Sequence, residues 1–208
     1  MTTLGVTGIV LAGGRSSRFG SDKLVAVVDG RPLLDLAIEG LAAVSDEILV
    51  VLAPGDDRDL AAACDTTTIR RVADPALHGG PLVGLLAGLE VADQPIVVLA
   101  GGDMPNLSPA VLGAMIRALV ASESGADAVI LASRGDRPPL PAVVRTGAAT
   151  DVARRLVGDG ERRLRSIFER LPTRILEEGE WRPLDPDGAT LRDVDRPADL
   201  SDGAPSSG

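Results

Sequence analysis

The amino-acid sequence predicts an α/β protein whose three-layer, doubly wound sheet is mostly parallel. Short apolar runs rich in Val, Ile and Leu are bounded by Gly, Pro or Asp, which is typical of strands buried on both faces. Amphipathic stretches with helical spacing separate these runs. Strands that alternate with helices in this way form a sheet covered on both faces, and its ligands bind at the carboxyl ends of the strands.

The individual elements follow from these patterns. Four apolar runs are predicted to be strands: Gly8–Leu11, Ile48–Leu52, Ile96–Ala100 and Ala128–Leu131. Apolar residues with the helical repeat predict helices over Leu34–Leu41, Leu82–Leu89, Leu112–Leu119, Val152–Val157 and Leu164–Leu171. Ser108 is the expected N-cap of the third helix, and Pro81 is expected in the first turn of the second.

Length and composition limit the class of protein. A chain of 208 residues, 45% of them hydrophobic, suits one well-cored domain, expected over residues 1–200 with a disordered polar tail at 201–208. A net charge of −9 and an aromatic content of 1% argue against nucleic-acid binding, which needs a basic surface and stacking side chains. No signal peptide or membrane-spanning run is visible, so we expect a soluble cytoplasmic protein without a membrane partner.

The scarcity of cysteine and histidine narrows the chemistry. A single Cys64 rules out an internal disulfide and fits a reducing compartment. With His78 as the only histidine, neither a zinc site nor a Ser-His-Asp triad is expected. Any bound metal would have oxygen ligands, which points to Mg²⁺.

The segment 11–23 directly follows the first predicted strand and is glycine-rich. Gly13 and Gly14 let the backbone approach a ligand closely, so that N–H groups can converge on anionic oxygens. The cations of the segment are Arg15, Arg18 and Lys23. The spacing fits neither the P-loop nor the dinucleotide-binding G-x-G-x-x-G motif, so a different phosphate-binding loop is predicted.

Acidic residues suggest where a metal could bind. Asp103 follows a hydrophobic strand and two glycines, where its carboxylate could hold a metal over the sheet edge, although it could instead cap the turn before Pro105. Asp193 and Asp195 would share one face of an extended segment. Either could join Asp103 on the metal, and the alternative is that they pair with the arginines beside them.

Two further segments could contact substrates. Asp74 could accept hydrogen bonds from a base or a ribose, with Gly80 and Gly84 allowing close approach, but the same residues also fit a plain strand, turn and helix. Arg162 and Arg163 could clamp the phosphate of a second substrate, or they could belong to a solvated charged turn.

Together these segments resemble the molybdenum cofactor guanylyltransferases, the MobA-like family of nucleotidyltransferases. The resemblance is carried by LAGGRSSRFGSDKL at Leu11–Leu24, DGRPL at Asp29–Leu33, GGPLVGLLAGLE at Gly79–Glu90, GGDMP at Gly101–Pro105 and DVDRPADL at Asp193–Leu200. It implies a Rossmann-like nucleotidyltransferase fold and transfer of GMP from Mg-GTP to molybdopterin or Mo-molybdopterin. The products would be pyrophosphate and the guanine dinucleotide cofactor, and molybdenum-insertion proteins or molybdoenzymes would be protein partners.

The resemblance also assigns roles to residues. The nucleotide-binding residues it implies are Leu11, Ala12, Gly13, Gly14, Lys23, Asp74, Gly80, Gly84 and Asp103. Asp103 would be the main Mg²⁺ ligand, and charge neutralisation by Arg15, Arg18, Lys23 and the metal would drive the reaction without a general base. The acceptor would contact Pro141, Arg162 and Arg163. The nucleotide-binding half is expected over about residues 1–105 and the acceptor-binding half over about 106–200.

One departure from the family pattern keeps alternatives open. Where guanylyltransferases usually have Asn-x-Asn-Thr-Pro, residues 193–197 read Asp-Val-Asp-Arg-Pro, and aspartates are more frequent there in cytidylyltransferases and sugar-phosphate nucleotidylyltransferases. Ala12-Gly13-Gly14 and Asp22, by contrast, match the guanylyl branch. The alternatives are therefore a molybdenum cofactor cytidylyltransferase, a sugar-1-phosphate nucleotidylyltransferase and a non-catalytic nucleotide-binding module.

Overall fold

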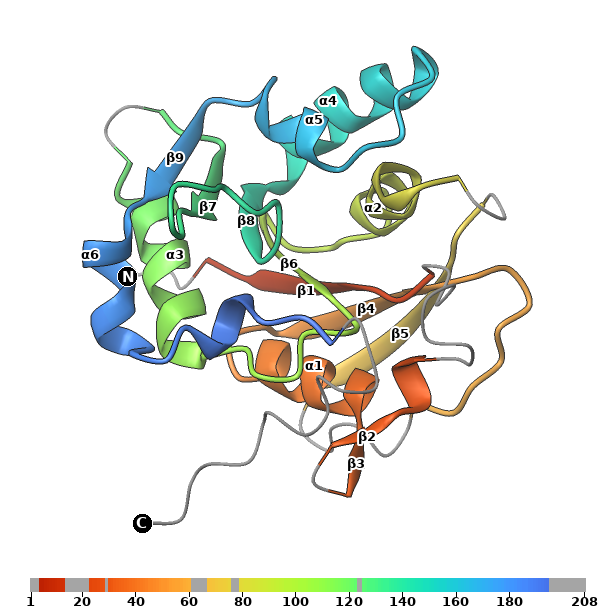
Figure 1. The fold of residues 1–208 in the computed structure, drawn as a ribbon. Helices are drawn as coiled ribbons and strands as arrows, with labels where there is room; N and C mark the ends of the chain where they lie inside the picture. The colour runs from red at the N-terminus through yellow and green to blue at the C-terminus, as the bar shows by residue number, and fades with distance from the viewer. Residues whose placement is uncertain are drawn as a thin grey trace.

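A computed structural model describes residues 4–13, 23–28, 30–60, 67–75, 79–122 and 125–194. Within these residues the main sheet has the strand order β5-β4-β1-β6-β8-β7-β9 (Figure 1). Its strands are β1 (Val6–Leu11), β4 (Glu47–Leu52), β5 (Thr68–Ala73), β6 (Ile96–Gly101), β7 (Ala128–Leu131), β8 (Ala142–Arg145) and β9 (Thr173–Leu176). A separate antiparallel ribbon pairs β2 (Val27–Val28) with β3 (Arg31–Pro32).

The sheet is parallel except at one strand. The strands β5, β4, β1 and β6 pair in parallel, and β7 pairs in parallel with β9. Strand β8 lies antiparallel between β6 and β7, so that its first residue, Ala142, pairs with Leu99 near the carboxyl end of β6. The predicted doubly wound, mostly parallel sheet is confirmed, and the antiparallel β8 brings a segment of the second half back to the edge where β1 and β6 end.

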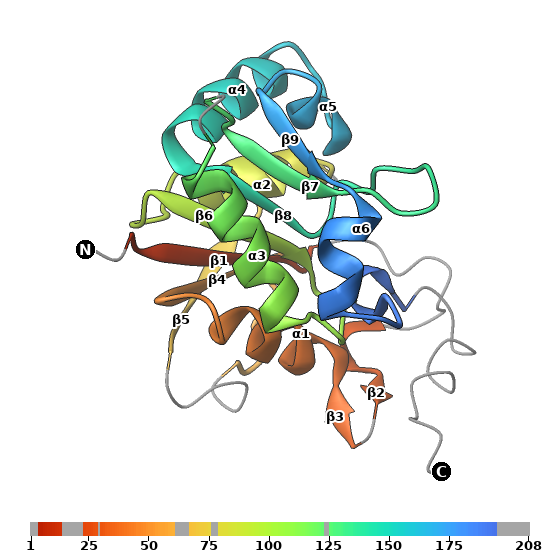
Figure 2. The same cartoon turned by 90° about the vertical axis from the view of Figure 1, so that its left-hand side faces the viewer.

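Helices cover both faces of the sheet (Figure 1 and Figure 2). The α-helices of the described residues are α1 (Leu33–Ala42), α2 (Pro81–Leu89), α3 (Pro109–Val120), α4 (Thr146–Gly158), α5 (Arg165–Phe168) and α6 (Glu178–Trp181). Short 3₁₀ turns are η1 (Lys23–Val25), η2 (Arg182–Leu184) and η3 (Ala189–Leu191). Apolar residues of α1 and α3 form one core cluster with the sheet, and those of α2, α4 and α5 form another on the opposite face.

Each predicted strand supplies both cores because successive residues point to opposite faces. In β4, Leu49 packs with the α2 cluster and Val50 with the α1–α3 cluster, and neither is exposed. Complete burial of such a side chain contributes roughly 1.5–3 kcal/mol. The continuous apolar runs of the sequence are therefore explained by a sheet that is covered on both sides.

The predicted helix starts are confirmed. Ser108 is the N-cap of α3, and its hydroxyl accepts a hydrogen bond from the Val111 N–H. Gly80 precedes α2 with φ of 86°, and Pro81 is its first residue. The helix expected at Val152–Val157 is the second half of the longer α4, and only Arg165–Phe168 of the stretch Leu164–Leu171 forms the α-helix α5.

The described part of the chain contains no helix with the length and apolarity that crossing a bilayer requires. The tail at 201–208 lies outside the described residues.

Candidate active site

The site lies where four parallel strands end. Because β1, β4, β5 and β6 run in the same direction, the segments that follow them meet at one edge of the sheet. Hydrogen bonds fix the first residues of these segments: the Ala12 N–H donates to the Val51 carbonyl at 2.8 Å, and the Gly102 N–H donates to the Leu11 carbonyl at 3.0 Å. The predicted phosphate loop thus starts from a rigid strand end.

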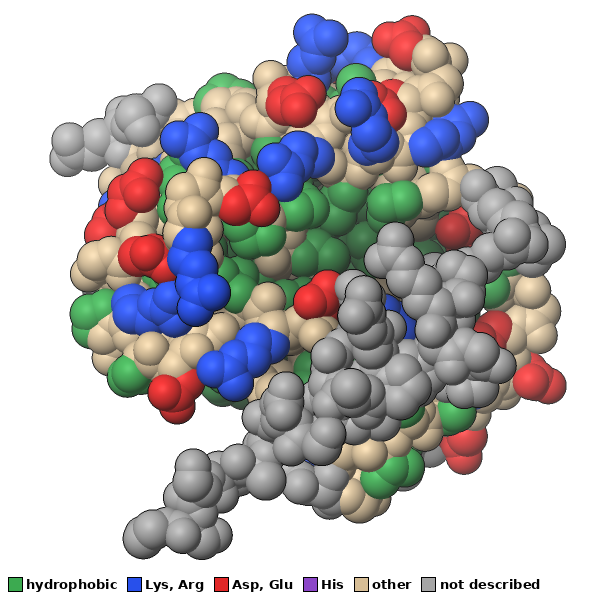
Figure 3. Space-filling model, in the orientation of Figure 1, with side chains coloured by type: hydrophobic (Ala, Val, Ile, Leu, Met, Phe, Trp, Pro, Cys, Tyr) green, Lys and Arg blue, Asp and Glu red, His purple; other side chains and the backbone are tan. Residues whose placement is uncertain are grey.

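A cavity of about 360 Å³ opens at this edge. Its lining residues are Leu11, Gly13, Val51, Asp74, Gly80, Pro81, Gly84, Gly101, Asp103 and Leu140. Figure 3 shows hydrophobic side chains on the floor of a hollow on this face, with Lys and Arg side chains along its border. Six residues predicted from the sequence to bind a nucleotide therefore surround one cavity: Leu11, Gly13, Asp74, Gly80, Gly84 and Asp103.

A short ion pair at the site joins Lys23 to Asp103. The Lys23 Nζ donates to Asp103 Oδ2 at 2.5 Å, and their side chains are only 17% and 24% exposed. Lys23 begins η1, while Asp103 follows the end of β6. Residues 80 positions apart in the chain are thus brought together at the cavity, as the family resemblance implied.

Two glycines make room for this ion pair. A Cβ at Gly101 would lie 2.4 Å from Asp103 Oδ1, so only glycine leaves the carboxylate its position over the strand end. A Cβ at Gly102 would lie 3.0 Å from the Leu24 side chain, which is buried beside it. The GGD sequence is therefore required by the packing around Asp103 as well as by the turn.

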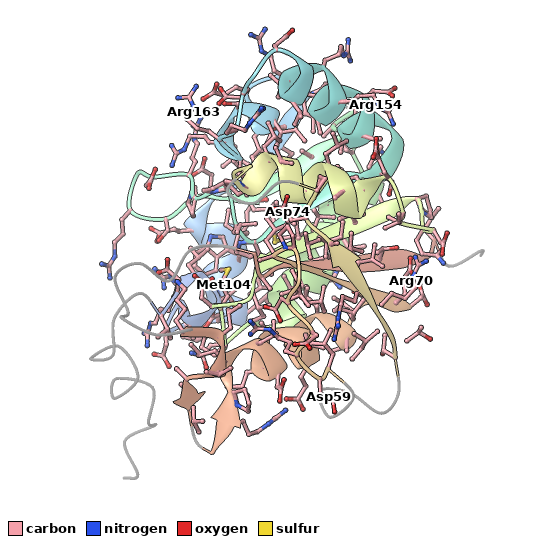
Figure 4. The ribbon with its side chains drawn as sticks, turned by 90° about the vertical axis from the view of Figure 1, so that its right-hand side faces the viewer. Asp59, Arg70, Asp74, Met104, Arg154 and Arg163 are labelled. Atoms are coloured by element: carbon pink, nitrogen blue, oxygen red, sulfur yellow. The ribbon has the colours of Figure 1, made fainter. Side chains whose placement is uncertain are left out.

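Asp74 is the buried carboxylate of the cavity. It directly follows β5, its N–H donates to the Leu52 carbonyl at 2.8 Å, and only 8% of the residue is exposed. Figure 4 shows it in the interior, close to α2. Added Cβ atoms at Gly13 and Gly84 would lie 3.6 and 3.4 Å from Asp74 Oδ2, so the two glycines keep space open around this carboxylate.

The segment containing Asp193 reaches the metal-binding candidate from the far end of the chain. The Val194 N–H donates to the Asp103 carbonyl at 3.0 Å, and the Val194 side chain packs with Val28 and Leu33. Asp193 is exposed beside this contact. Asp195 lies outside the described residues, and so do Gly14, Arg15 and Arg18.

Two of the predicted acceptor residues, Pro141 and Arg162, adjoin residues that line the cavity. Pro141 is buried between β8 and the cavity residue Leu140. Arg162 contacts the start of α2: the Leu82 N–H donates to its carbonyl at 3.2 Å, and a Cβ at Gly80 would lie 2.8 Å from its Cβ. The loop expected to bind the acceptor is thus bonded to the helix expected to face the nucleotide.

Both guanidinium groups in this loop have partners, either in the loop or in the last turn of α4. Arg162 donates to the Val157 carbonyl at 3.1 Å, and Arg163 donates to the Glu161 carboxylate at 2.8 Å. Hydrogen bonds from the Arg163 side chain and main chain, from Ser166 and from the Arg162 N–H hold the pKa of Glu161 well below its usual value. Figure 4 shows Arg163 at the periphery, near α5.

The donor set fits a magnesium ion that binds together with phosphates. No group of three or more His, Cys, Asp or Glu residues that could hold a metal occurs among the described residues. Asp103 alone, or with Asp193, offers one or two carboxylates, and Mg²⁺ in nucleotide sites is bound by one or two carboxylates while water and phosphate oxygens supply the rest.

Three cavity residues were not singled out from the sequence: Val51, Gly101 and Leu140. Val51 is the last residue but one of the predicted strand Ile48–Leu52, and Gly101 directly follows the predicted strand Ile96–Ala100, so their place at the sheet edge could have been inferred. Another overlooked signal is that Lys23 is the only lysine among 21 basic residues, the other 20 being arginines.

The fold and the cavity define an α/β protein with a candidate ligand site at the glycine-rich carboxyl edge of a mostly parallel sheet. The chain belongs to the MobA-like NTP transferase family, whose domain matches residues 8–175.

Individual relatives agree with this assignment. A molybdenum cofactor guanylyltransferase from Burkholderia ambifaria is 38% identical over 175 residues, which cover 81% of this chain and 83% of that protein. One from Burkholderia vietnamiensis is 36% identical over 178 residues, covering 82% and 85%.

Solved structures share the fold. The molybdopterin-guanine dinucleotide biosynthesis protein A from Archaeoglobus fulgidus superposes with a TM-score of 0.74 at 23% identity, covering 94% of this chain and 95% of that one. The 4-diphosphocytidyl-2C-methyl-D-erythritol synthase from Anaerococcus prevotii superposes with a TM-score of 0.70 at 15% identity, covering 95% of each. The predicted Rossmann-like nucleotidyltransferase fold is confirmed.

Proposed function

We propose that this protein transfers GMP from GTP to molybdopterin or Mo-molybdopterin and releases pyrophosphate. The observation that carries the proposal is the Lys23–Asp103 pair in a cavity at the carboxyl edge of the sheet, in a chain of the MobA-like family. The guanylyl specificity is supported by the relatives from two Burkholderia species, which are named molybdenum cofactor guanylyltransferases.

In the proposed reaction, a phosphate oxygen of the acceptor attacks the α-phosphorus of GTP. A new P–O bond forms, the bond between the α- and β-phosphates breaks, and pyrophosphate leaves with that electron pair. The attacking phosphate is already anionic at neutral pH, so the protein needs no general base. Positioning and charge neutralisation are what the site must supply.

The residues at the phosphate end would divide this work. The backbone at Ala12 and Gly13 would approach the triphosphate, and the ammonium group of Lys23 would bind its oxygens, joined by Gly14, Arg15 and Arg18. Asp103 would hold Mg²⁺, which when bound neutralises charge on the triphosphate and polarises the α-phosphate. Asp193 or Asp195 would be the second carboxylate near the metal.

The buried Asp74 would read the base. A carboxylate with two oxygens can accept hydrogen bonds from two adjacent donors, and the Watson–Crick edge of guanine offers such a pair while that of cytosine offers one amino group. Space around the carboxylate at Gly84 supports this role, because its added Cβ would lie only 3.4 Å from Asp74 Oδ2. Gly80 would border the same part of the nucleotide.

The acceptor would lie on the side of Pro141, Arg162 and Arg163. This assignment makes residues 1–105 mainly the nucleotide-binding half and residues 106–200 mainly the acceptor-binding half of one domain. Leu140 and the Arg162 carbonyl support it, since each brings the second half to the cavity or to α2.

The test is a reconstituted assay with purified protein, Mg²⁺ and molybdopterin, in which pyrophosphate and the dinucleotide are measured with GTP or CTP. We expect product with GTP, and we expect Asp103→Asn and Lys23→Gln to lower turnover by about 100-fold or more. Arg117→Gln is the matched charge control, because Arg117 is exposed on α3, and it should leave turnover unchanged.

Each outcome separates the alternatives. Product with CTP in place of GTP would indicate a molybdenum cofactor cytidylyltransferase. Turnover only with a sugar 1-phosphate as acceptor would indicate a sugar-1-phosphate nucleotidylyltransferase. Nucleotide binding without turnover in any of these assays would indicate a non-catalytic binding module. Circular dichroism spectra of the variants establish that losses of turnover are not losses of fold.

A further inference from the structure

The contact between Lys23 and Asp103 joins the two groups that the proposed reaction assigns to opposite ligands. Asp103 would hold the metal cation and Lys23 the triphosphate anion. In the structure, however, the two side chains form an ion pair, with 2.5 Å between Lys23 Nζ and Asp103 Oδ2. We propose that this ion pair couples the two ligands, so that metal and nucleoside triphosphate bind strongly together and each binds weakly alone. The proposal rests on the proposed function and adds a binding rule for the same site.

A metal arriving alone meets a carboxylate that is already paired. Asp103 Oδ2 accepts from the Lys23 ammonium, and Oδ1 is turned over Gly101, where an added Cβ would lie only 2.4 Å away. A Mg²⁺ bound to Oδ2 would stand roughly 4 Å from the ammonium group, given a metal–oxygen distance of about 2.1 Å. Two cations at that separation repel strongly where both side chains are three-quarters or more shielded from water.

A triphosphate that binds without a metal is also opposed by a like charge. To bind Lys23, its oxygens must approach the Asp103 carboxylate, which carries the same sign of charge. When metal and triphosphate arrive together, the metal takes Asp103 and the phosphate takes Lys23, so every charge keeps an opposite partner. Coupling of this kind is reciprocal, and between two binding sites it typically amounts to about 5- to 150-fold.

The pair can open without movement of the backbone. Leu24 is buried and contacts the Gly102 position, where an added Cβ would lie 3.0 Å from its side chain, and the Ala26 N–H donates to the Lys23 carbonyl at 3.0 Å. These contacts anchor the main chain of η1. The ammonium group sits at the end of four flexible methylenes, so it can swing from the carboxylate to a phosphate while the loop stays in place.

Two variants test the proposal with ligands added singly. Lys23→Gln should tighten binding of Mn²⁺ alone, measured by electron paramagnetic resonance, by about tenfold. Asp103→Asn should tighten binding of GTP in the presence of EDTA, measured by calorimetry, by a similar factor. The control Arg117→Gln removes the same charge as Lys23→Gln without touching Asp103, and it should change neither affinity by more than twofold.

A second measurement uses the wild-type protein, because its only lysine can be observed alone. Protein labelled with [ε-¹³C]lysine gives one Lys23 side-chain resonance. We expect that resonance to move when Mg²⁺ and a non-hydrolysable GTP analogue are added together, and to move much less with either one at the same concentration. This readout does not depend on turnover or on the folding of a variant.

Failure of the coupling and failure of the function look different. If Lys23→Gln leaves Mn²⁺ affinity unchanged or weakens it, and Asp103→Asn does not tighten metal-free GTP binding, the coupling is wrong even when the wild-type protein turns over normally. An equal movement of the lysine resonance with either ligand alone contradicts it as well. Absence of GTP-dependent turnover in folded wild-type protein would instead overturn the proposed function.

Discussion

Replacing Gly80 with alanine tests how firmly the acceptor-side loop is held on the nucleotide-side helix. Gly80 has φ of 86° and ψ of 163°, a conformation that residues with a side chain almost never adopt. It also packs against the main chain of Arg162, whose carbonyl accepts the Leu82 N–H at 3.2 Å. An added methyl group therefore meets an unfavourable backbone conformation and a fixed neighbour at the same time.

The size of the effect follows from these two contributions. The backbone conformation alone costs an alanine about 1–3 kcal/mol. The new Cβ would lie 2.8 Å from the Arg162 Cβ and 2.9 Å from its carbonyl oxygen, so the Arg162 main chain must retreat. Weakening the hydrogen bond from the Leu82 N–H costs a further ~0.5–1.5 kcal/mol of unfolding free energy. We expect Gly80→Ala to lower the free energy of unfolding by about 2–4 kcal/mol.

The assay is urea unfolding followed by circular dichroism, with two matched substitutions. Gly125 has φ of 70° with nothing within 4 Å of an added Cβ, so Gly125→Ala carries only the conformational part, about 1 kcal/mol. Gly147 lies in α4 with open space around it, so Gly147→Ala should stabilise the protein by about 0.5–1 kcal/mol. If Gly80→Ala is no more destabilising than Gly125→Ala, the contact with Arg162 contributes nothing and the reasoning is wrong.

Two further predictions concern stability away from the cavity. Burial favours the neutral form of Glu47, but hydrogen bonds from Thr7, the Asp93 N–H and Arg70 outweigh it and lower the pKa of Glu47. Its stabilising contribution is complete above the ordinary glutamate pKa and is lost as the pH falls through the lowered one. Glu47→Gln should therefore lower the free energy of unfolding by about 1.5–3 kcal/mol at pH 7, and by progressively less below about pH 4.5. Urea titrations at several pH values measure this difference, and a loss that does not change with pH would contradict the account. Ser108→Ala removes the N-cap of α3 and should lower the unfolding free energy by about 0.5–1 kcal/mol while leaving turnover unchanged, which unfolding curves and the transfer assay measure together.

The central strands could be predicted because burial on both faces leaves an unmistakable apolar run. β5 could not, since its sequence, Thr-Ile-Arg-Arg-Val-Ala, belongs to a half-exposed edge strand in which Arg70 bonds Glu47 of β4. β8 is also apolar, but it is only four residues long and Pro138, Pro139 and Pro141 come directly before it, a pattern typical of an irregular segment. Figure 4 shows Arg70 at the edge of the molecule, well away from Asp74 and Met104 near its middle.

The candidate site was predictable to the extent that it is built from strand ends. Gly13 and Asp103 follow β1 and β6, which were both predicted, and a parallel sheet must bring such positions to one edge. Asp74 follows β5, which the apolar pattern did not predict, so its place at this edge rested on the family resemblance. The contact of Arg162 with Gly80 has no local signal, because it depends on how the loop after α4 packs on α2. The direct bond between Lys23 and Asp103 likewise required the three-dimensional structure, although both residues were singled out from their motifs.

The cavity is built where segments from the beginning and the end of the chain touch. The Leu82 N–H donates to the Arg162 carbonyl at 3.2 Å, and the Val194 N–H donates to the Asp103 carbonyl at 3.0 Å. Leu140 lines the cavity together with glycines of the first half. In-line attack on a phosphorus atom requires the attacking oxygen and the leaving group to be aligned closely, and small displacements lower the rate steeply. Because each of these contacts joins an early segment to a late one, the alignment of two substrates would depend on them as much as on the motifs themselves. Substitutions such as Gly80→Ala can therefore alter the reaction without removing any group that touches phosphate.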